Sequence, residues 1–329
     1  MHFPPFDRSK GGINPPDCHA DGRRLRIPAY SCVFRPAPIS ATLLPMTSRL
    51  PHASPAWHAE LQLRFARSGE RTVLRENRHF GPLRVQKALY PEGDAVCQTI
   101  LLHPPSGIAG GDQLQIRAAV ENGAHAQLTT PGAGKWYRSG GADAGQQIEL
   151  SVGDGATLEW LPQESIVFDG ARAHMRTRVS LAADSRFIGW DVLCLGRAAS
   201  GERFLSGRFD LFYRIDRGGT PLWIERGRFD GSDPMLASPA GWAGATVCGT
   251  LVTSFPELPV QAAQLLEVCR RIAPVDGASH AITALPGLLM ARYLGNNSEA
   301  ARLWFAALWA IIRPVCCGRA ALTPRIWNT

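Results

Sequence analysis

The chain has 329 residues, of which 45% are hydrophobic and 19% are charged, so it can bury a core as one large domain or two ordinary ones. A net charge of +7 and a pI of about 9.2 bring nucleic acid and acidic proteins into consideration as partners. The basic residues are scattered, and no Lys/Arg block is interleaved with aromatic residues. An acidic protein partner is therefore favoured over nucleic acid.

Cysteine usage and the longest apolar run exclude two further classes of protein. The eight cysteines include no CxxC pair and show no disulfide framework, which is typical of a reducing compartment. The apolar run 303–312 lies between Arg302 and Arg313 and is shorter than the roughly 18 residues that a membrane span needs. We therefore expect a cytoplasmic protein without a membrane-spanning segment.

Residues 1–45 differ in composition from the rest of the chain. They hold eight of the 25 prolines and show little apolar periodicity, so they cannot bury enough surface to offset their ordering entropy. We predict that this segment is a disordered extension, and we hypothesise that Met46 is the true start. Residues 46–329 then form one domain.

Alternation of apolar and polar residues dominates the chain from about residue 56 to residue 255. It begins at Leu61, Leu63 and Phe65 and recurs over 171–181 and 203–215, with the period of two that a half-buried strand requires. The segments 146–152 and 157–161 flank Gly153-Asp154-Gly155 and predict a hairpin. No helical segments separate these strands, which argues against a doubly wound parallel sheet.

Helical spacing replaces this alternation near the C-terminus. Apolar residues recur at helical positions over 260–272. Ser298 fits the N-cap of a second helix, and Pro314 is expected to stop that helix. The sequence thus predicts a mainly β protein, with strands to about residue 255 and a small helical part over about 260–312.

Catalytic motifs are missing from the sequence. A P-loop at Gly134-Lys135 needs glycine where Thr129 stands and Ser or Thr where Trp136 stands. Neither GxSxG nor HExxH occurs. An alternative class, a hydrolase that uses His103 or His125, stays open, although a lone histidine beside a turn or strand more often forms a structural hydrogen bond. We predict that the protein is not an enzyme.

Carboxylates inside apolar strands are more informative. Asp191 lies in a strand whose two faces are both apolar, Glu225 lies in a second apolar strand, and Asp112 follows a glycine-rich loop. Because an isolated buried carboxylate costs several kcal/mol, it must be paired, protonated or open to water. Two interpretations remain: an internal salt bridge with Arg197 or Arg226, or carboxylates that line a wet internal passage.

Two further sets of residues are candidates for partner binding. The polar face of 171–181 carries Arg172, Arg176 and Arg178, and it is either a solvated surface or a docking site for an acidic partner. Trp304 and Trp309 on the last predicted helix either pack in the core or line a groove for a partner.

Several longer motifs, taken in order, carry a family resemblance. They are 81–87 (GPLRVQK), 103–105 (HPP) with 107–112 (GIAGGD), 130–133 (TPGA) with 135–138 (KWYR), 158–164 (LEWLPQE), 189–191 (GWD), 195–197 (LGR), 200–202 (SGE) and 324–329 (PRIWNT). With these motifs the chain resembles the UreD family of urease accessory proteins, called UreH in some organisms. Ser106 and Gly134 depart from the family pattern, and residues before Met46 lie outside it.

The resemblance implies a cytoplasmic chaperone built as a β-helix-like stack of strands with helices near the C-terminus. It implies that the protein bridges apo-urease to UreF and UreG, holds no tight cofactor, and helps nickel in transit to reach urease. Oxygen ligands and water hold nickel more loosely than several His or Cys ligands do. Asp112, Asp191 and Glu225 lie in or near the matching segments, so we expect them to line the nickel passage.

Overall fold

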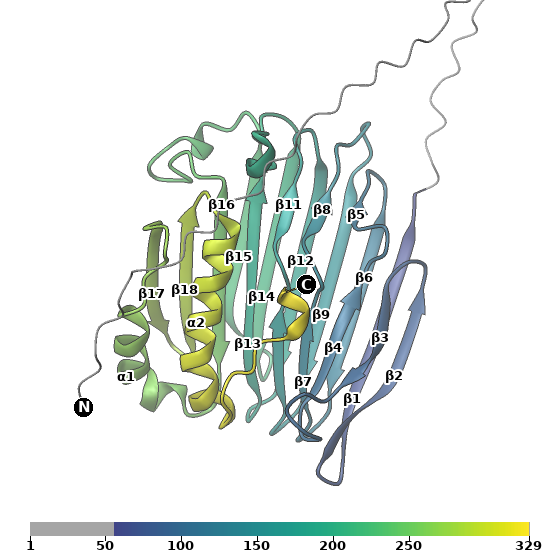
Figure 1. Ribbon diagram of the computed structural model, residues 1–329, viewed down its shortest axis with the longest axis vertical. Coiled ribbons are helices and arrows are strands. Elements are labelled where there is room, and N and C mark those ends of the chain that lie inside the picture. Colours follow the sequence, from purple (N-terminus) through teal and green to yellow (C-terminus); the bar gives the residue numbers. More distant parts are fainter. Residues whose placement is uncertain (1–55, 329) are drawn as a thin grey trace, which may run out of the picture. The chain divides into compact units, whose positions relative to one another are not determined.

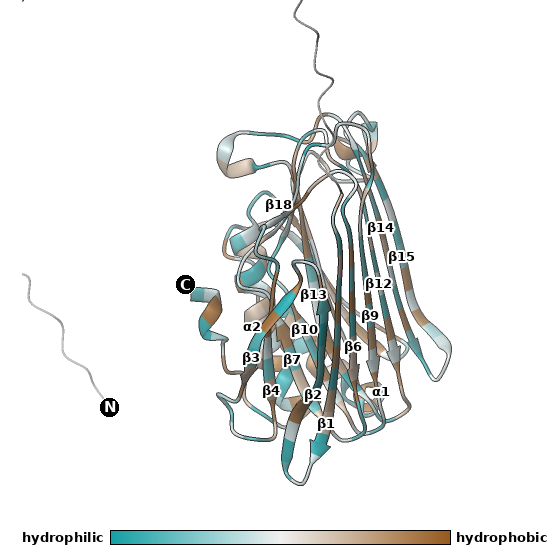
Figure 2. Ribbon diagram, turned by 90° about the vertical axis from the view of Figure 1, so that its right-hand side faces the viewer, coloured by the Kyte–Doolittle hydropathy of each residue, from teal (hydrophilic) through white to brown (hydrophobic). Residues whose placement is uncertain are grey.

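The structure is a computed structural model that describes residues 56–328. The predictions for residues 1–45 and for a start at Met46 lie outside this range. Within it, strands form two sheets that lie face to face, and two helices pack on one of them (Figure 1, Figure 2). This arrangement confirms the predicted mainly β class with a small C-terminal helical part.

One sheet of the described part has seven strands. In order across the sheet they are β15 (Thr220–Asp230), β14 (Arg208–Arg217), β12 (Arg172–Leu181), β9 (Ala144–Val152), β6 (Gln113–Val120), β1 (His58–Ser68) and β2 (Arg71–Phe80). The five central strands run parallel, and the edge strands β2 and β15 run antiparallel to their neighbours.

The other sheet has eleven strands between residues 56 and 328. Its main path is β17 (Ser279–Leu285), β18 (Leu288–Gly295), β16 (Val247–Ser254), β13 (Arg186–Leu195), β10 (Thr157–Leu161), β7 (His125–Thr129), β4 (Cys97–Leu102) and β3 (Arg84–Leu89). Three short strands, β5 (Gly107–Ile108), β8 (Gly134–Trp136) and β11 (Ser165–Val167), form a row that joins it at β13.

The chain winds between the sheets as a coil. It runs from β6 to β7 and β8, from β9 to β10 and β11, and from β12 to β13, so each coil places one long strand in each sheet. Equivalent strands of successive coils pair in parallel. The parallel strands are thus linked without helices, which confirms the β-helix-like stack.

The predicted hairpin at residues 153–155 is wrong. β9 and β10 belong to different sheets and do not pair, so the turn between them carries the chain from one sheet to the other. Gly155 takes a φ of +62°, and a Cβ at Gly153 would collide with Asn122 of the preceding coil. Two glycines are therefore needed because neighbouring turns stack closely.

Two hydrophobic cores hold these layers together. Strand alternation turns Leu61, Leu63 and Phe65 into the space between the sheets, as their spacing predicts. A second core lies between the eleven-stranded sheet and helices α1 (Leu258–Arg270) and α2 (Ser298–Cys317). The β17–β18 hairpin lies between these helices in the chain, where the sequence pattern indicated only helix.

Helix α2 differs in two details from the prediction. Its N-cap is Asn297, whose side chain accepts a hydrogen bond from the Ala300 amide, and Ser298 is the first helical residue. The helix continues through Pro314 to Cys317 and ends at Gly318. Proline costs one backbone hydrogen bond in a helix, and tertiary packing of this last turn outweighs that cost.

Helix α2 is also the one helix of the described residues that is long and apolar enough to cross a membrane. Half of its apolar window is buried within the protein, and its Arg313 side chain is fully buried in an ion network. A core helix passes the same test of length and composition. The packing of α2 is that of a core helix.

Candidate functional site

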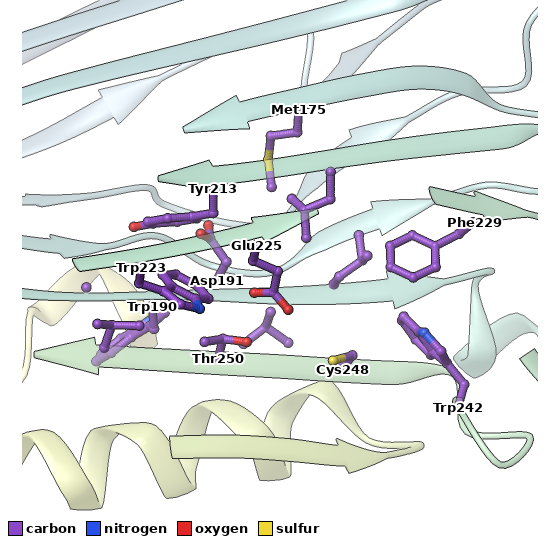
Figure 3. Close-up of a pocket in the computed structure, with 15 residues that line it drawn as sticks. Met175, Trp190, Asp191, Tyr213, Trp223, Glu225, Phe229, Trp242, Cys248 and Thr250 are labelled. Carbon is purple, nitrogen blue, oxygen red and sulfur yellow. The ribbon is translucent and has the colours of Figure 1, made fainter. Parts of the chain in front are cut away.

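A small cavity lies between the two sheets, near β15. Its volume is about 50 Å³, enough for a few water molecules. Most lining side chains are apolar or aromatic, such as Met175, Trp223 and Trp242, and two carboxylates, Asp191 and Glu225, project into it (Figure 3). Two acids in a confined, mainly apolar space are an unusual combination for a hydrophobic core.

Strand register brings the polar groups of this cavity together. In the eleven-stranded sheet Asp191, Thr250 and Arg292 are neighbours across β13, β16 and β18. In the seven-stranded sheet Tyr213 pairs with Glu225 across β14 and β15. Because residues on one rung of a sheet share a face, all five side chains point into the space between the sheets.

Asp191 is the least compensated of these groups. Its Oδ2 atom has no hydrogen-bond partner among the described residues. The side chain is partly accessible to solvent, and it lines the cavity. Burial, together with the negative charge of Glu225, raises the pKa of Asp191 to about 8. Burial also raises the pKa of Tyr213 well above its usual value.

Glu225 is held by an arginine from the opposite sheet. Nη1 of Arg292 donates a hydrogen bond of 2.5 Å to Oε1 of Glu225 and one of 3.1 Å to the Thr250 hydroxyl. The guanidinium also lies 5.6 Å from the Trp223 ring centroid. Glu225 and Arg292 are both partly exposed, so this ion pair lies where the cavity meets solvent and ties the two sheets together.

The arginines that the sequence suggested as partners are elsewhere. Arg197 pairs with Glu202 at 2.6 Å, and Arg226 lies over Phe212 on the outer face of the seven-stranded sheet. Arg226 follows Glu225 directly in β15, and successive strand residues point to opposite faces, so Arg226 cannot reach Glu225. The expected partners were therefore wrong.

Asp112 is separate from the other two candidate acids. Its Oδ1 accepts a hydrogen bond from the Trp57 amide at 2.8 Å, and its Oδ2 accepts one from the Ala109 amide at 2.9 Å. Asp112 is buried and does not line the cavity. Its contacts are those of a residue that fixes the loop before β6.

The two candidate histidines lie in different surroundings. His103 is near Asp112, and burial lowers its pKa while the charge of Asp112 opposes this effect. His125 Nε2 lies 2.8 Å from Oε1 of Glu159, within a network that also includes Arg313. Within residues 56–328 the two histidines therefore belong to separate sets of contacts.

The Glu159 network is a feature that sequence reasoning missed. Glu159 and Arg313 are both fully buried, and the Trp309 indole donates a hydrogen bond of 2.7 Å to Glu159. Burial by itself raises the pKa of Glu159, but His125 and Arg313 outweigh this effect and lower the pKa to about 2. The signal was available, because Glu159 lies between apolar neighbours as Asp191 does.

The candidate partner residues divide into exposed and buried sets. Arg172 pairs with Asp143 at 2.9 Å, whereas Arg176 and Arg178 are exposed and have no carboxylate partner in the described part of the chain. Trp304 and Trp309 are 2% and 1% exposed and pack in the second core. These two indoles thus offer no surface to a partner, and of the two interpretations of them, packing in the core is the correct one.

No group of three or more His, Cys, Asp or Glu side chains among residues 56–328 is placed to hold a metal ion. The cavity offers two carboxylates, and one of them is already paired with Arg292. Such a set lacks the three or four protein ligands typical of a resident transition metal.

The fold and this site define a class of protein: a coiled β scaffold that has an acidic internal cavity and no catalytic constellation among its described residues. Residues 58–328 match the family model described as UreD urease accessory protein. The chain belongs to the UreD family of urease accessory proteins, which are chaperones of urease maturation rather than enzymes.

Individual relatives agree with this family. The chain is 74% identical over 288 residues to urease accessory protein UreD of Dechloromonas aromatica (strain RCB), covering 86% of this chain and 100% of the relative. Identity to UreD of Azoarcus sp. (strain BH72) is 52% over 277 residues, with 84% and 96% of the two chains covered. Identity to UreD of Nitrosococcus oceani is 49% over 299 residues, with coverage of 90% and 98%.

Proposed function

We propose that this protein is a cytoplasmic scaffold that bridges apo-urease to UreF and, through UreF, to UreG. We further propose that nickel in transit to the urease active site passes through the cavity between the sheets. The observation that carries this proposal is the unpartnered Asp191 carboxylate, which faces a cavity that Glu225 also lines.

The chemistry of the cavity suits a cargo ion better than a resident one. Carboxylate oxygens and water hold nickel more loosely than several imidazole or thiolate ligands do. Asp191 supplies an oxygen that no protein donor occupies, and Glu225 lies close enough for its charge to raise the pKa of Asp191. Asp191 gives up its proton when a cation binds, and the two acids can then hold a divalent cation without enclosing it.

The ion pair at the edge of the cavity adds a requirement for entry. Glu225 is bound to Arg292 by a hydrogen bond of 2.5 Å, and both side chains are partly exposed. An ion that binds Oε1 of Glu225 has to displace its hydrogen bond from Arg292. Asp112, whose two oxygens already accept backbone amide hydrogen bonds, has a structural role in this proposal.

The cytoplasmic location is supported by the thiols. All six cysteines within the described residues are free, and burial raises the pKa of Cys194 and Cys248 to about 12 and about 11. Thiols of this kind are inert and are typical of a reducing compartment.

The test is to replace each cavity carboxylate and measure nickel in urease. We expect Asp191→Ala and Glu225→Ala to fold and to copurify with apo-urease and UreF, and to lower the nickel content of the urease produced. Glu202→Ala, which removes a carboxylate that Arg197 binds away from the cavity, is the matched control. Normal nickel loading with both cavity variants would contradict the passage, while failure of the unmodified protein to copurify with apo-urease and UreF would contradict the scaffold.

A further inference from the structure

The outer face of the seven-stranded sheet is open to solvent. Both helices pack on the other sheet, and no described element covers β12, β14 and β15 on the side away from it (Figure 2). A groove of about 580 Å³ runs across these three strands. We call it the arginine groove, and it is lined chiefly by His174, Arg176, Arg178, Asp210, Phe212, Arg226 and Arg228.

Most arginines on this face have their charge compensated nearby. The pairs are Arg64–Glu121, Arg117–Glu149, Arg172–Asp143, Arg208–Asp210, Arg214–Asp216 and Arg228–Asp230, all within 3.3 Å. Arg176, Arg178 and Arg226 have no carboxylate partner among residues 56–328 and are exposed. Three arginines without a carboxylate partner thus lie together in the arginine groove.

Register and stacking place these three arginines around one ring. Arg176, Phe212 and Arg226 share a rung across β12, β14 and β15. The guanidinium carbons of Arg178 and Arg226 lie 5.8 Å and 5.5 Å from the Phe212 ring centroid. A guanidinium stacked on an aromatic ring is held in place while its N–H edges stay free for a bidentate acceptor.

Protection of a sheet edge does not explain this cluster. Unpaired cations discourage strand pairing where they lie on an edge strand, as Arg226 does on β15, but Arg176 and Arg178 lie on β12, which has a neighbour on each side. Like charges that lie close together across strands destabilise a sheet. Arg176, beside His174, also contributes to lowering the pKa of that histidine, after burial. The cluster therefore has a cost for the free protein that a bound anion relieves.

We propose that the arginine groove binds an acidic peptide segment of a partner protein, whose carboxylates pair with Arg176, Arg178 and Arg226. This inference deepens the proposed scaffold function by giving the chemistry of one partner surface. It does not depend on nickel passage, since the groove and the cavity lie on opposite faces of the seven-stranded sheet.

A protein ligand fits the groove better than nucleic acid. Single-stranded nucleic acid needs an aromatic face on which bases can stack, but Phe212 lies beneath Arg178 and Arg226. Asp210 within the groove interrupts the positive track that a continuous phosphate backbone follows. Carboxylates spaced along a peptide can meet the arginines individually and avoid this acid.

The experiment measures binding of a fluorescein-labelled decamer of glutamate by fluorescence anisotropy at low salt. The test variant is Arg176→Gln/Arg178→Gln/Arg226→Gln. The matched control, Arg117→Gln/Arg172→Gln/Arg214→Gln, removes the same charge from arginines of the same face that have carboxylate partners. Thermal melts of both variants check that they remain folded.

We expect the test variant to bind the peptide at least about tenfold more weakly than the unmodified protein, and the control at most about threefold more weakly. An equal loss in both variants would show that net charge alone is responsible and would overturn the proposal, as would failure of the unmodified protein to bind. Tighter binding of a labelled oligothymidylate of equal charge, lost in the same test variant, would also overturn it in favour of nucleic acid.

Discussion

Arg313 offers the sharpest test of how the C-terminal helix is held. Its guanidinium is fully buried and donates to Glu159 at 2.9 and 3.0 Å and to Glu92 at 2.7 and 2.8 Å. The Ala320 carbonyl also accepts from it. Replacing Arg313 with Met keeps much of the side-chain volume and removes all of these donors.

The expected cost follows from what remains buried. Glu159 is fully buried, and without Arg313 its charge is opposed only by His125 and the Trp309 indole. Removing one partner of a buried pair costs about 3–5 kcal/mol. We expect Arg313→Met to lower the free energy of unfolding by that amount and the Tm by roughly 10 °C.

The pH dependence of the free energy of unfolding is a second test of the same network. The pKa of Glu159 falls from 4.5 to about 2 on folding. A lowered carboxyl pKa stabilises the fold above the unfolded value, and this stabilisation is lost as pH falls from about 4.5 through about 2. The difference corresponds to about 3 kcal/mol. Glutamine does not titrate, so we expect the free energy of unfolding of Glu159→Gln to fall by about 3 kcal/mol less than that of the unmodified protein over this pH range.

Urea unfolding at pH 7, and at several values below pH 5, measures both effects. The control is Arg271→Met, because Arg271 and Glu267 form a surface pair in which both side chains are 70% exposed. Such a pair contributes less than about 1 kcal/mol. If Arg313→Met costs no more than Arg271→Met, the buried network does not hold α2 and the reasoning is refuted.

Three further predictions concern the cavity and the coil. Since burial raises the pKa of Asp191 from 3.8 to about 8, the unmodified protein should lose up to about 4 kcal/mol of its free energy of unfolding as pH rises from 5 to 8. Urea titrations of Asp191→Asn should show no such decrease. Arg292→Met breaks the partly exposed pair with Glu225 and should cost about 1 kcal/mol in the same assay; no change would mean that the pair does not tie the sheets together. A Cβ at Gly153 collides with the preceding coil, so Gly153→Ala should lower the free energy of unfolding by roughly 1–3 kcal/mol and the Tm by several degrees. Gly132 has open space around it, so Gly132→Ala should leave both unchanged.

The strands were predictable from sequence, but their pairing was not. Alternation at Leu61, Leu63 and Phe65 shows which face is buried, because one buried face imposes a period of two. The same alternation suits a hairpin and a coil, so the pattern around Gly153 led to the wrong connection. β17 was missed because most of its residues are exposed and the period is weak.

The candidate site was predictable only in part. Asp191 was recognised because a charge between two apolar faces needs a local explanation. Its surroundings depend on Arg292, which is about 100 residues away in sequence and becomes a neighbour only through the register of β13, β16 and β18. Asp112 carried a similar signal, but its oxygens bind backbone amides that sequence alone does not locate.

The arginine cluster shows the same limit on the outer face. Arg172, Arg176 and Arg178 are equivalent in the strand pattern, yet only Arg172 has a carboxylate partner. That partner, Asp143, lies in the loop before β9 of the neighbouring coil. Which arginines stay uncompensated is therefore decided by coil stacking rather than by local sequence.

The central claim, that nickel moves through the cavity, is tested most directly by the rate at which nickel appears in urease. Purified apo-urease in complex with this protein, UreF and nickel-loaded UreG is sampled over time, with Asp191→Asn compared against the unmodified protein and Glu202→Gln. The account predicts that Asp191→Asn slows nickel transfer by at least about tenfold, equivalent to about 1.4 kcal/mol, while the complex stays intact. Transfer at the unmodified rate through an intact Asp191→Asn complex would contradict it.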